Sequence, residues 1–85
     1  MNANPESSFS MLFMSIASTA LMELGLVPDE NAQLKSSNKE MAKFNIDLLI
    51  MLQGKTKGNL TTDEAQFLEN LIKDLQLKFV QNSKS

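Results

Sequence analysis

The stretch from Phe9 to Leu24, FSMLFMSIASTALMEL, limits the possible folds of this chain more than any other segment. Only four hydroxyl residues and Glu23 are polar in it. A helix that is apolar on nearly every side must be buried on nearly every side. A chain of 85 residues has little surface with which to cover such a helix, so we expect it at the centre of an assembly.

Local signals mark both ends of this helix. Ser7 or Ser8 can accept a hydrogen bond from the first free backbone N–H groups, as N-cap residues do. Gly25 suits the left-handed position after the last turn, and Pro28 prevents continuation. Residues 1–8 have no apolar periodicity and are expected to form a flexible leader.

A second helix is expected after a polar connection over residues 29–36. Ser37 and Glu40 have the spacing of a capping box, which places the helix start there. The apolar residues that repeat at helical spacing and predict its buried side are Met41, Phe44, Leu48 and Met51 or Leu52, with a wider arc formed by Ile46, Leu49 and Ile50. Its end falls at Gly54 or Gly58, and the lysines at 55 and 57 favour Gly58 because cations stabilise a last turn.

The third helix begins at a second capping box, formed by Thr61 and Glu64. Its apolar face comprises Leu68, Leu71, Ile72, Leu75 and Phe79. The short loop before it makes the second and third helices an antiparallel hairpin. The sequence therefore predicts an all-α fold of three helices in a single domain over residues 9–80, assembled as a homo-oligomeric bundle, with a flexible tail over residues 81–85.

Composition argues against several functional classes. The chain has no cysteine or histidine, the residues that most often supply nucleophiles, general bases and transition-metal ligands. We therefore expect neither an enzyme nor a metal or other cofactor. The net charge is −2 and there is no arginine, which disfavours nucleic-acid binding. The apolar stretch is too short and too interrupted for a bilayer span.

The first helix has one bulky side and one side of smaller residues. The bulky side, which we expect to pack within the subunit, comprises Phe9, Phe13, Ile16, Ala20 and Leu24. The other side, which we expect to form the oligomer interface, comprises Ser8, Met11, Ser15, Ser18, Thr19 and Met22. The alternative is a simple three-helix bundle that buries its first helix without a second copy.

Two segments, FSMLFMSIASTALMELGLVP and NIDLLIMLQGKTKGNLTTDEAQFLENLIKDLQLKFV, resemble the bacterial family known as domain of unknown function 1844. The pieces KTKGNLT and LGLVP carry the resemblance most specifically. The chain departs from the family at Gly54, where similar proteins usually have a helix former. The resemblance implies a bacterial, cytoplasmic, all-helical protein, with no activity or site residue to carry over.

The expected function is accordingly that of a cytoplasmic protein-interaction or scaffold module that self-associates through its first helix and offers a surface to another protein. One alternative is a membrane-surface or lipid-associated protein, although interfacial helices usually have a strongly charged face that the first helix lacks. Another alternative is an adaptor bound to a translation-related particle.

Overall fold

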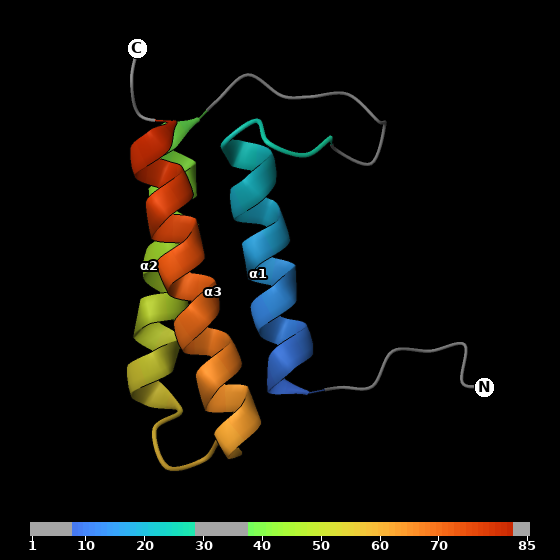
Figure 1. Ribbon diagram of the computed structural model, residues 1–85, viewed down its shortest axis with the longest axis vertical. Helices are drawn as coiled ribbons and strands as arrows, with labels where there is room; N and C mark the ends of the chain where they lie inside the picture. Colours follow the sequence, from blue (N-terminus) through green and yellow to red (C-terminus); the bar gives the residue numbers. More distant parts are fainter. Residues whose placement is uncertain (1–7, 29–37, 83–85) are drawn as a thin grey trace, which may run out of the picture.

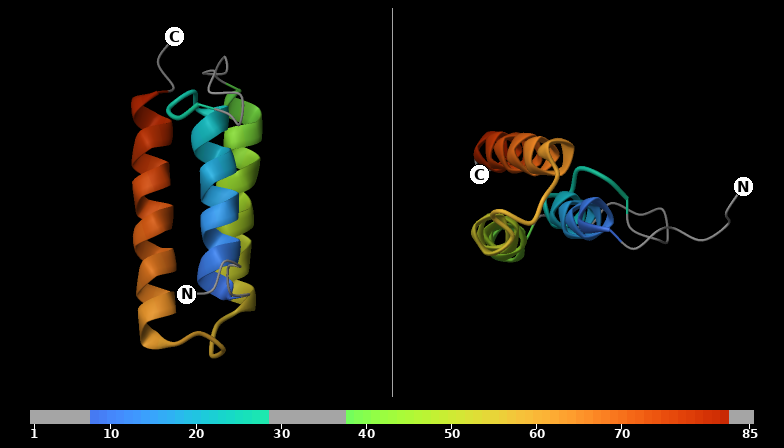
Figure 2. Two further views of the ribbon diagram at one scale, coloured as in Figure 1. Left: turned by 90° about the vertical axis from the view of Figure 1, so that its right-hand side faces the viewer. Right: turned by 90° about the horizontal axis from the view of Figure 1, so that it is seen from below.

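The computed structural model describes residues 8–28 and 38–82, which form three helices. They are α1 (Phe9–Glu23), α2 (Lys39–Lys55) and α3 (Thr62–Gln81). The helices run up, down and up, and α1 lies against the α2–α3 hairpin (Figures 1 and 2). The described part of the chain has no strand, so the all-α, three-helix prediction is confirmed. The expected leader and tail lie almost wholly outside the described residues, as does the connection over residues 29–36.

The ends of α1 follow from local hydrogen bonds. The Ser8 hydroxyl accepts from the backbone N–H of Met11 at 3.2 Å, which makes Ser8 the N-cap. At the other end Gly25 has φ 74°, a conformation that costs a glycine nothing. The N–H groups of Leu26 and Gly25 donate to the carbonyls of Leu21 and Met22. These two bonds are those of a Schellman motif, which was the expected exit.

The start of α2 differs from the expected one. Asn38, rather than Ser37, is the N-cap: its side-chain oxygen accepts from the N–H of Met41 at 3.2 Å. Asparagine is at least as good a cap as serine, so the sequence offers two adjacent starts. The Asn38 N–H also donates to the carbonyl of Glu23, which brings the start of α2 to the end of α1.

The end of α2 lies between the two glycines. The helix ends at Lys55, so Gly54 is inside its last turn and the expected stop at Gly58 is three residues too late. The reason is Thr56, a buried C-cap whose hydroxyl donates to the Leu52 carbonyl at 2.6 Å. A side chain that bonds to the helix backbone in this way competes with further helical turns. Gly58, with φ 87°, then reverses the chain toward α3.

The two glycines should respond oppositely to alanine. An added Cβ at Gly54 meets nothing within 4 Å, so Gly54→Ala is expected to stabilise the protein by about 0.5–1 kcal/mol through helix propensity. Gly58→Ala also has open space but keeps a positive φ, which should destabilise it by about 1 kcal/mol. Urea unfolding of both variants at one protein concentration checks this. Equal shifts would show that Gly54 does not lie in a regular helix.

The capping box of α3 is confirmed. The Thr61 hydroxyl accepts from the N–H of Glu64 at 3.1 Å, and the Glu64 carboxylate accepts from the N–H of Thr61 at 2.9 Å. The predicted apolar face is also confirmed, since Leu68, Ile72 and Leu75 are buried and Leu71 and Phe79 pack against them.

The core lies on the axis of the bundle, where all three helices meet. Its buried apolar members are Phe13, Ala17, Ala20, Ile46, Leu49, Leu68, Ile72 and Leu75. From α1 they occupy positions of the predicted bulky side, joined by Ala17. Phe9 lies at the edge, 36% exposed, and its ring stacks on that of Phe13 with centroids 6.0 Å apart.

The predicted buried side of α2 is wrong in part. Met41, Phe44, Ile50 and Met51 are exposed, by 43%, 54%, 40% and 46%, whereas Leu52, the alternative to Met51, packs against the core. The buried residues of this helix are Ala42, Asn45, Ile46 and Leu49. The apolar residues of α2 cover a wider arc than two neighbouring helices can bury. The part of the arc around Ile46 and Leu49 is the part that packs against α1 and α3. Asn45 is satisfied within the helix, where its amide donates to the Met41 carbonyl at 3.1 Å.

Candidate functional site

The side of α1 that faces away from α2 and α3 is the main candidate site. Along α1, Phe13, Ala17 and Ala20 are buried, whereas Met11, Leu12 and Met14 are between 43% and 46% exposed. A single helix thus has a covered and an uncovered apolar side. Leu12 and Met14 lie on the two flanks of the uncovered side, with Met11 between them. Scattered apolar residues are normal on protein surfaces, but several on the uncovered side of one helix indicate an interaction site.

The residues predicted for the oligomer interface lie on this uncovered side. Ser8, Met11, Ser15 and Ser18 are exposed, and Thr19 and Met22 are partly buried. At 100° per residue, Met11, Ser15, Ser18 and Met22 form a row on the face opposite the buried residues. The structure therefore brings the predicted residues together on one surface, and their role as an interface stays a prediction.

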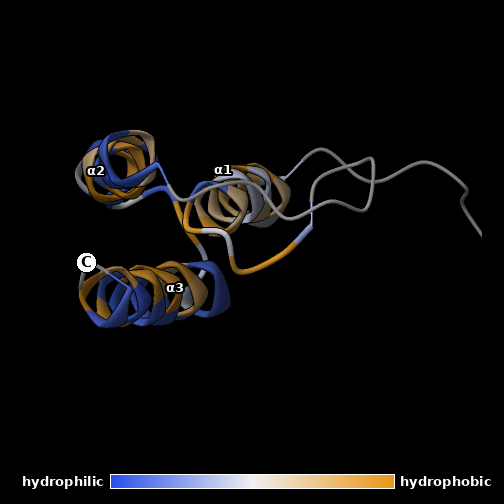
Figure 3. Ribbon diagram, turned by 90° about the horizontal axis from the view of Figure 1, so that it is seen from above, coloured by the Kyte–Doolittle hydropathy of each residue, from blue (hydrophilic) through white to orange (hydrophobic). Residues whose placement is uncertain are grey.

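A partner that covers this face would have to satisfy few polar groups. The Thr19 hydroxyl donates to the Ser15 carbonyl at 3.1 Å, and the Ser8 hydroxyl caps the helix. Glu23, the last residue of α1, is its single charged residue. Figure 3 shows few hydrophilic residues on α1 and many on α2 and α3. Burying this face would thus cost little in the desolvation of polar groups.

Sequence reasoning missed the exposed apolar residues of α2, because it assigned Met41 and Phe44 to the buried side and left Met51 as an alternative to Leu52. One signal was available: α2 has apolar residues around more than half of its circumference, more than a helix at the edge of a small bundle can bury. A helix of that kind has a second apolar side that must stay in solvent or meet a partner.

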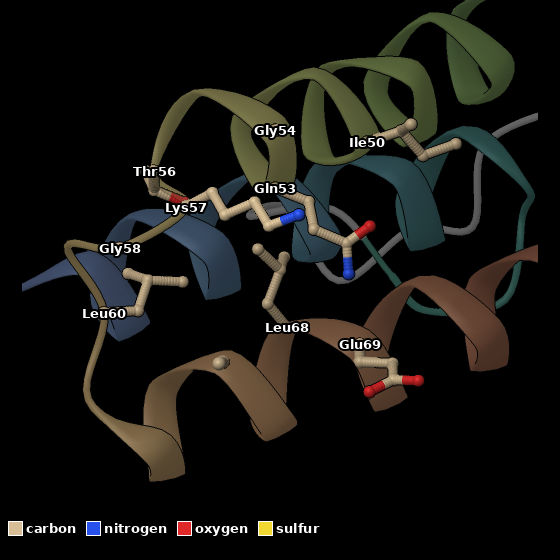
Figure 4. Close-up of a pocket in the computed structure, with 10 residues that line it drawn as sticks. Ile50, Gln53, Gly54, Thr56, Lys57, Gly58, Leu60, Leu68 and Glu69 are labelled. Atoms are coloured by element: carbon tan, nitrogen blue, oxygen red, sulfur yellow. The ribbon is translucent and has the colours of Figure 1, made fainter.

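A hollow of about 570 Å³ lies where the α2–α3 turn meets the two helices (Figure 4). Its lining includes Leu60 and Leu68 from the apolar interior and Gln53, Lys57 and Glu69 from the surface. This volume is in the range of ligand pockets, but such pockets also contain polar groups that converge on the ligand. The buried Thr56 hydroxyl is already bonded to Leu52. The other polar side chains of the lining, Gln53, Lys57 and Glu69, are exposed to solvent at the surface of the hollow (Figure 4).

Among the described residues, no cluster of three or more histidine, cysteine, aspartate or glutamate side chains could hold a metal ion. Ion pairs on the surface join side chains four residues apart, in Lys43–Asp47, Glu69–Lys73 and Asp74–Lys78. Exposed pairs of this kind contribute at most about 0.5 kcal/mol each and indicate solvated faces. No helix in residues 8–28 and 38–82 is both long and apolar enough to cross a bilayer.

Comparison with known families gives one match. The family described as "Domain of unknown function (DUF1844)" matches residues 6–81, nearly the whole chain. The chain belongs to this family. The resemblance noted from the sequence is thereby confirmed. No curated protein and no solved structure matches the chain.

For this member of the DUF1844 family, the two segments that carry the resemblance most specifically have clear structural roles. LGLVP contains the Schellman motif that ends α1. KTKGNLT forms the end of α2 and the turn into α3, including Gly58 with its positive φ and the cap Thr61. Both segments end a helix and turn the chain, so neither by itself indicates a chemical activity.

Proposed function

We propose that this protein is a non-enzymatic interaction module that self-associates through the outer face of α1 and presents its remaining surface to another protein. The observation that supports this proposal most directly is the exposure of Met11, Leu12 and Met14 on a helix whose single charged residue is its last. Covering these side chains with a second copy removes apolar area from water, which is the main driving force of association.

A second copy is a better occupant of this face than a lipid surface. Helices that lie on membranes combine their apolar side with a strongly charged side, usually rich in lysine or arginine. Helix α1 has neither residue. Its small residues Ser15 and Ser18 instead allow another helix to approach closely.

The first test is the molar mass in solution over a range of protein concentrations, followed by sedimentation or light scattering. We expect a mass above that of one chain, which falls on dilution. A monomer at every concentration would refute self-association. Binding to liposomes by the folded protein would instead support the membrane-surface alternative.

A charge in the middle of the α1 face should weaken association. Ser15 is exposed and lies in this row, so Ser15→Glu is expected to leave the folded subunit intact and to raise the dissociation constant by at least about tenfold, because the new carboxylate would be buried without a partner. Asn70→Glu adds the same charge at an exposed position of α3 and serves as the control. If both variants dissociate equally, net charge and not the α1 face controls assembly.

A further inference from the structure

Helix α2 carries an outward apolar seam of its own. Its members, spaced by three, four and three residues, are Met41, Phe44, Leu48 and Met51. Phe44 is 54% exposed, and Leu48 is partly buried. This alternation of three and four residues keeps side chains on one side of a helix, and it is the spacing on which a partner helix packs knobs into holes.

The α2 seam lies on the side of α2 that is nearer to α1. A small hollow between α2 and α3 is lined by Lys43, Ile46 and Ile50, which mark the α3 side of α2. At 100° per residue, Leu48 lies at least about 100° from the α2 residues of this hollow, which also include Asp47. Phe44 lies about 100° or more from Lys43 and Ile50 and about 60° from Asp47. The seam therefore faces outward and toward α1.

Helix α1 has an exposed seam on its α2 side. A shallow hollow against Glu64 of α3 is lined by Phe9 and Leu12, which mark the α3 side of α1. Met14 lies about 200° around the helix from Leu12. Met11, Met14 and Ser18 thus form a row, spaced by three and four residues, on the opposite flank. The seams of α1 and α2 are neighbours, and together we call them the α1–α2 face.

The size of the α1–α2 face suits a dimer. A helix of 15 residues is about 22 Å long, and packed helices lie about 8–10 Å apart. One helix therefore projects only about 200 Å², and two neighbouring helices about 400 Å². A stable interface buries about 800 Å² of accessible surface on each partner, an area larger than its projection because side chains make the surface rough. The outer face of α1 alone is too small, so α2 must contribute.

We propose that a second copy of this chain covers the α1–α2 face in an antiparallel, two-fold arrangement, so that α1 and α2 of both copies form a four-helix interface. This proposal rests on the self-association proposed above and adds the second helix and its direction. In a two-fold interface the same patch of each subunit meets itself. The two-fold axis passes beside Leu48, one of the residues of the α2 seam.

Charges at the two ends of the α2 seam select the antiparallel direction. Glu40 and Lys55 are exposed and lie at equal distances from the midpoint between Asp47 and Leu48. Neither forms an ion pair with another described residue. Antiparallel packing brings Glu40 of one copy to Lys55 of the other, twice in each dimer. Parallel packing would instead place like charges together, which is unfavourable.

Exchanging these charges tests the arrangement. Glu40→Lys alone and Lys55→Glu alone are each expected to raise the dissociation constant by about tenfold at low salt, because two exposed pairs become repulsive in every dimer. The double variant, Glu40→Lys with Lys55→Glu, should recover most of the affinity. An equimolar mixture of the two single variants should form a heterodimer, in which both pairs are attractive again. High salt should reduce all these differences.

The rescue distinguishes contact between copies from an effect within one helix. Each single change places an unfavourable charge at an end of α2, and these penalties add in the double variant. Within one chain the two residues are about 22 Å apart, beyond the range of strong interaction in salt. A double variant that associates less well than both single variants would overturn the antiparallel arrangement.

A matched pair of truncations tests the contribution of α2 independently of charge. Phe44 and Leu77 are 54% and 56% exposed, and Leu77 lies on the outer side of α3. Phe44→Ala should raise the dissociation constant by about tenfold or more, and Leu77→Ala by less than about twofold. If Ser15→Glu dissociates the protein but Phe44→Ala does not, the α1 interface stands and the four-helix arrangement is wrong. A wild-type monomer would overturn both.

Discussion

Replacing Phe13 with alanine is expected to lower the free energy of unfolding by about 3–5 kcal/mol, as the truncation of a fully buried phenylalanine does in other proteins. Phe13 is fully buried at the middle of the contact between α1 and the α2–α3 hairpin. Alanine would remove the apolar ring and leave a cavity that the rigid helices can close only partly. Phe9 would also lose the ring on which its own ring stacks.

Because a small domain is marginally stable, this loss should leave Phe13→Ala largely unfolded at ambient temperature. Circular dichroism during urea unfolding measures the change, at one fixed protein concentration because association adds to apparent stability. Leu77→Ala, which removes an exposed apolar side chain from α3, is the control and should change stability by less than about 0.5 kcal/mol. A Phe13→Ala protein as stable as this control would mean that α1 does not pack on the hairpin.

Enlarging Ala20 to leucine is expected to cost about 2–3 kcal/mol for the opposite reason. Ala17, Ala20 and Ala42 are at most 1% exposed, and their small side chains let α1 and α2 approach closely. A leucine at position 20 has no space there and would push α1 outward. The shift would also change the angle between the α1 and α2 seams, so association should weaken along with stability.

The control for Ala20→Leu is the same substitution at an exposed alanine. Ala65 is exposed in the first part of α3, where a leucine has room beside the hollow at the α2–α3 turn. Ala65→Leu should therefore be neutral or slightly stabilising. Thermal unfolding of both variants provides the comparison. Similar melting temperatures would indicate that α1 can move away from α2 without loss, and that the α1–α2 packing is loose.

The position of α1 in the subunit explains how one helix can serve both folding and assembly. Its sequence predicts a helix buried on nearly every side, yet the other two helices cover only one of its sides. The uncovered side continues onto α2, whose exposed apolar residues extend the same face. The three helices therefore fold with a conventional core and still present an apolar surface for a second copy in the proposed assembly.

Local sequence patterns were sufficient to predict the number of helices, most of their ends and the buried face of α3. Ser8, Gly25 and the Thr61–Glu64 capping box could be identified because a cap depends on residues within one or two turns. The face of α3 could be identified because most of its apolar residues form one stripe, whereas its ion pairs Glu69–Lys73 and Asp74–Lys78 lie in solvent. The predicted interface residues of α1 were found on one surface for the same reason: helical spacing alone determines which residues share a face.

Which part of α2 is buried follows from the packing of the three helices and from no local pattern. Its apolar arc contains two possible faces, one around Ile46 and Leu49 and one around Phe44 and Leu48, and helical spacing is the same for both. The choice depends on where α1 and α3 stand relative to α2, and that position follows from contacts among residues distant in sequence. The end of α2 was decided in the same way, because Thr56 closes the helix in a buried environment that no local pattern specifies.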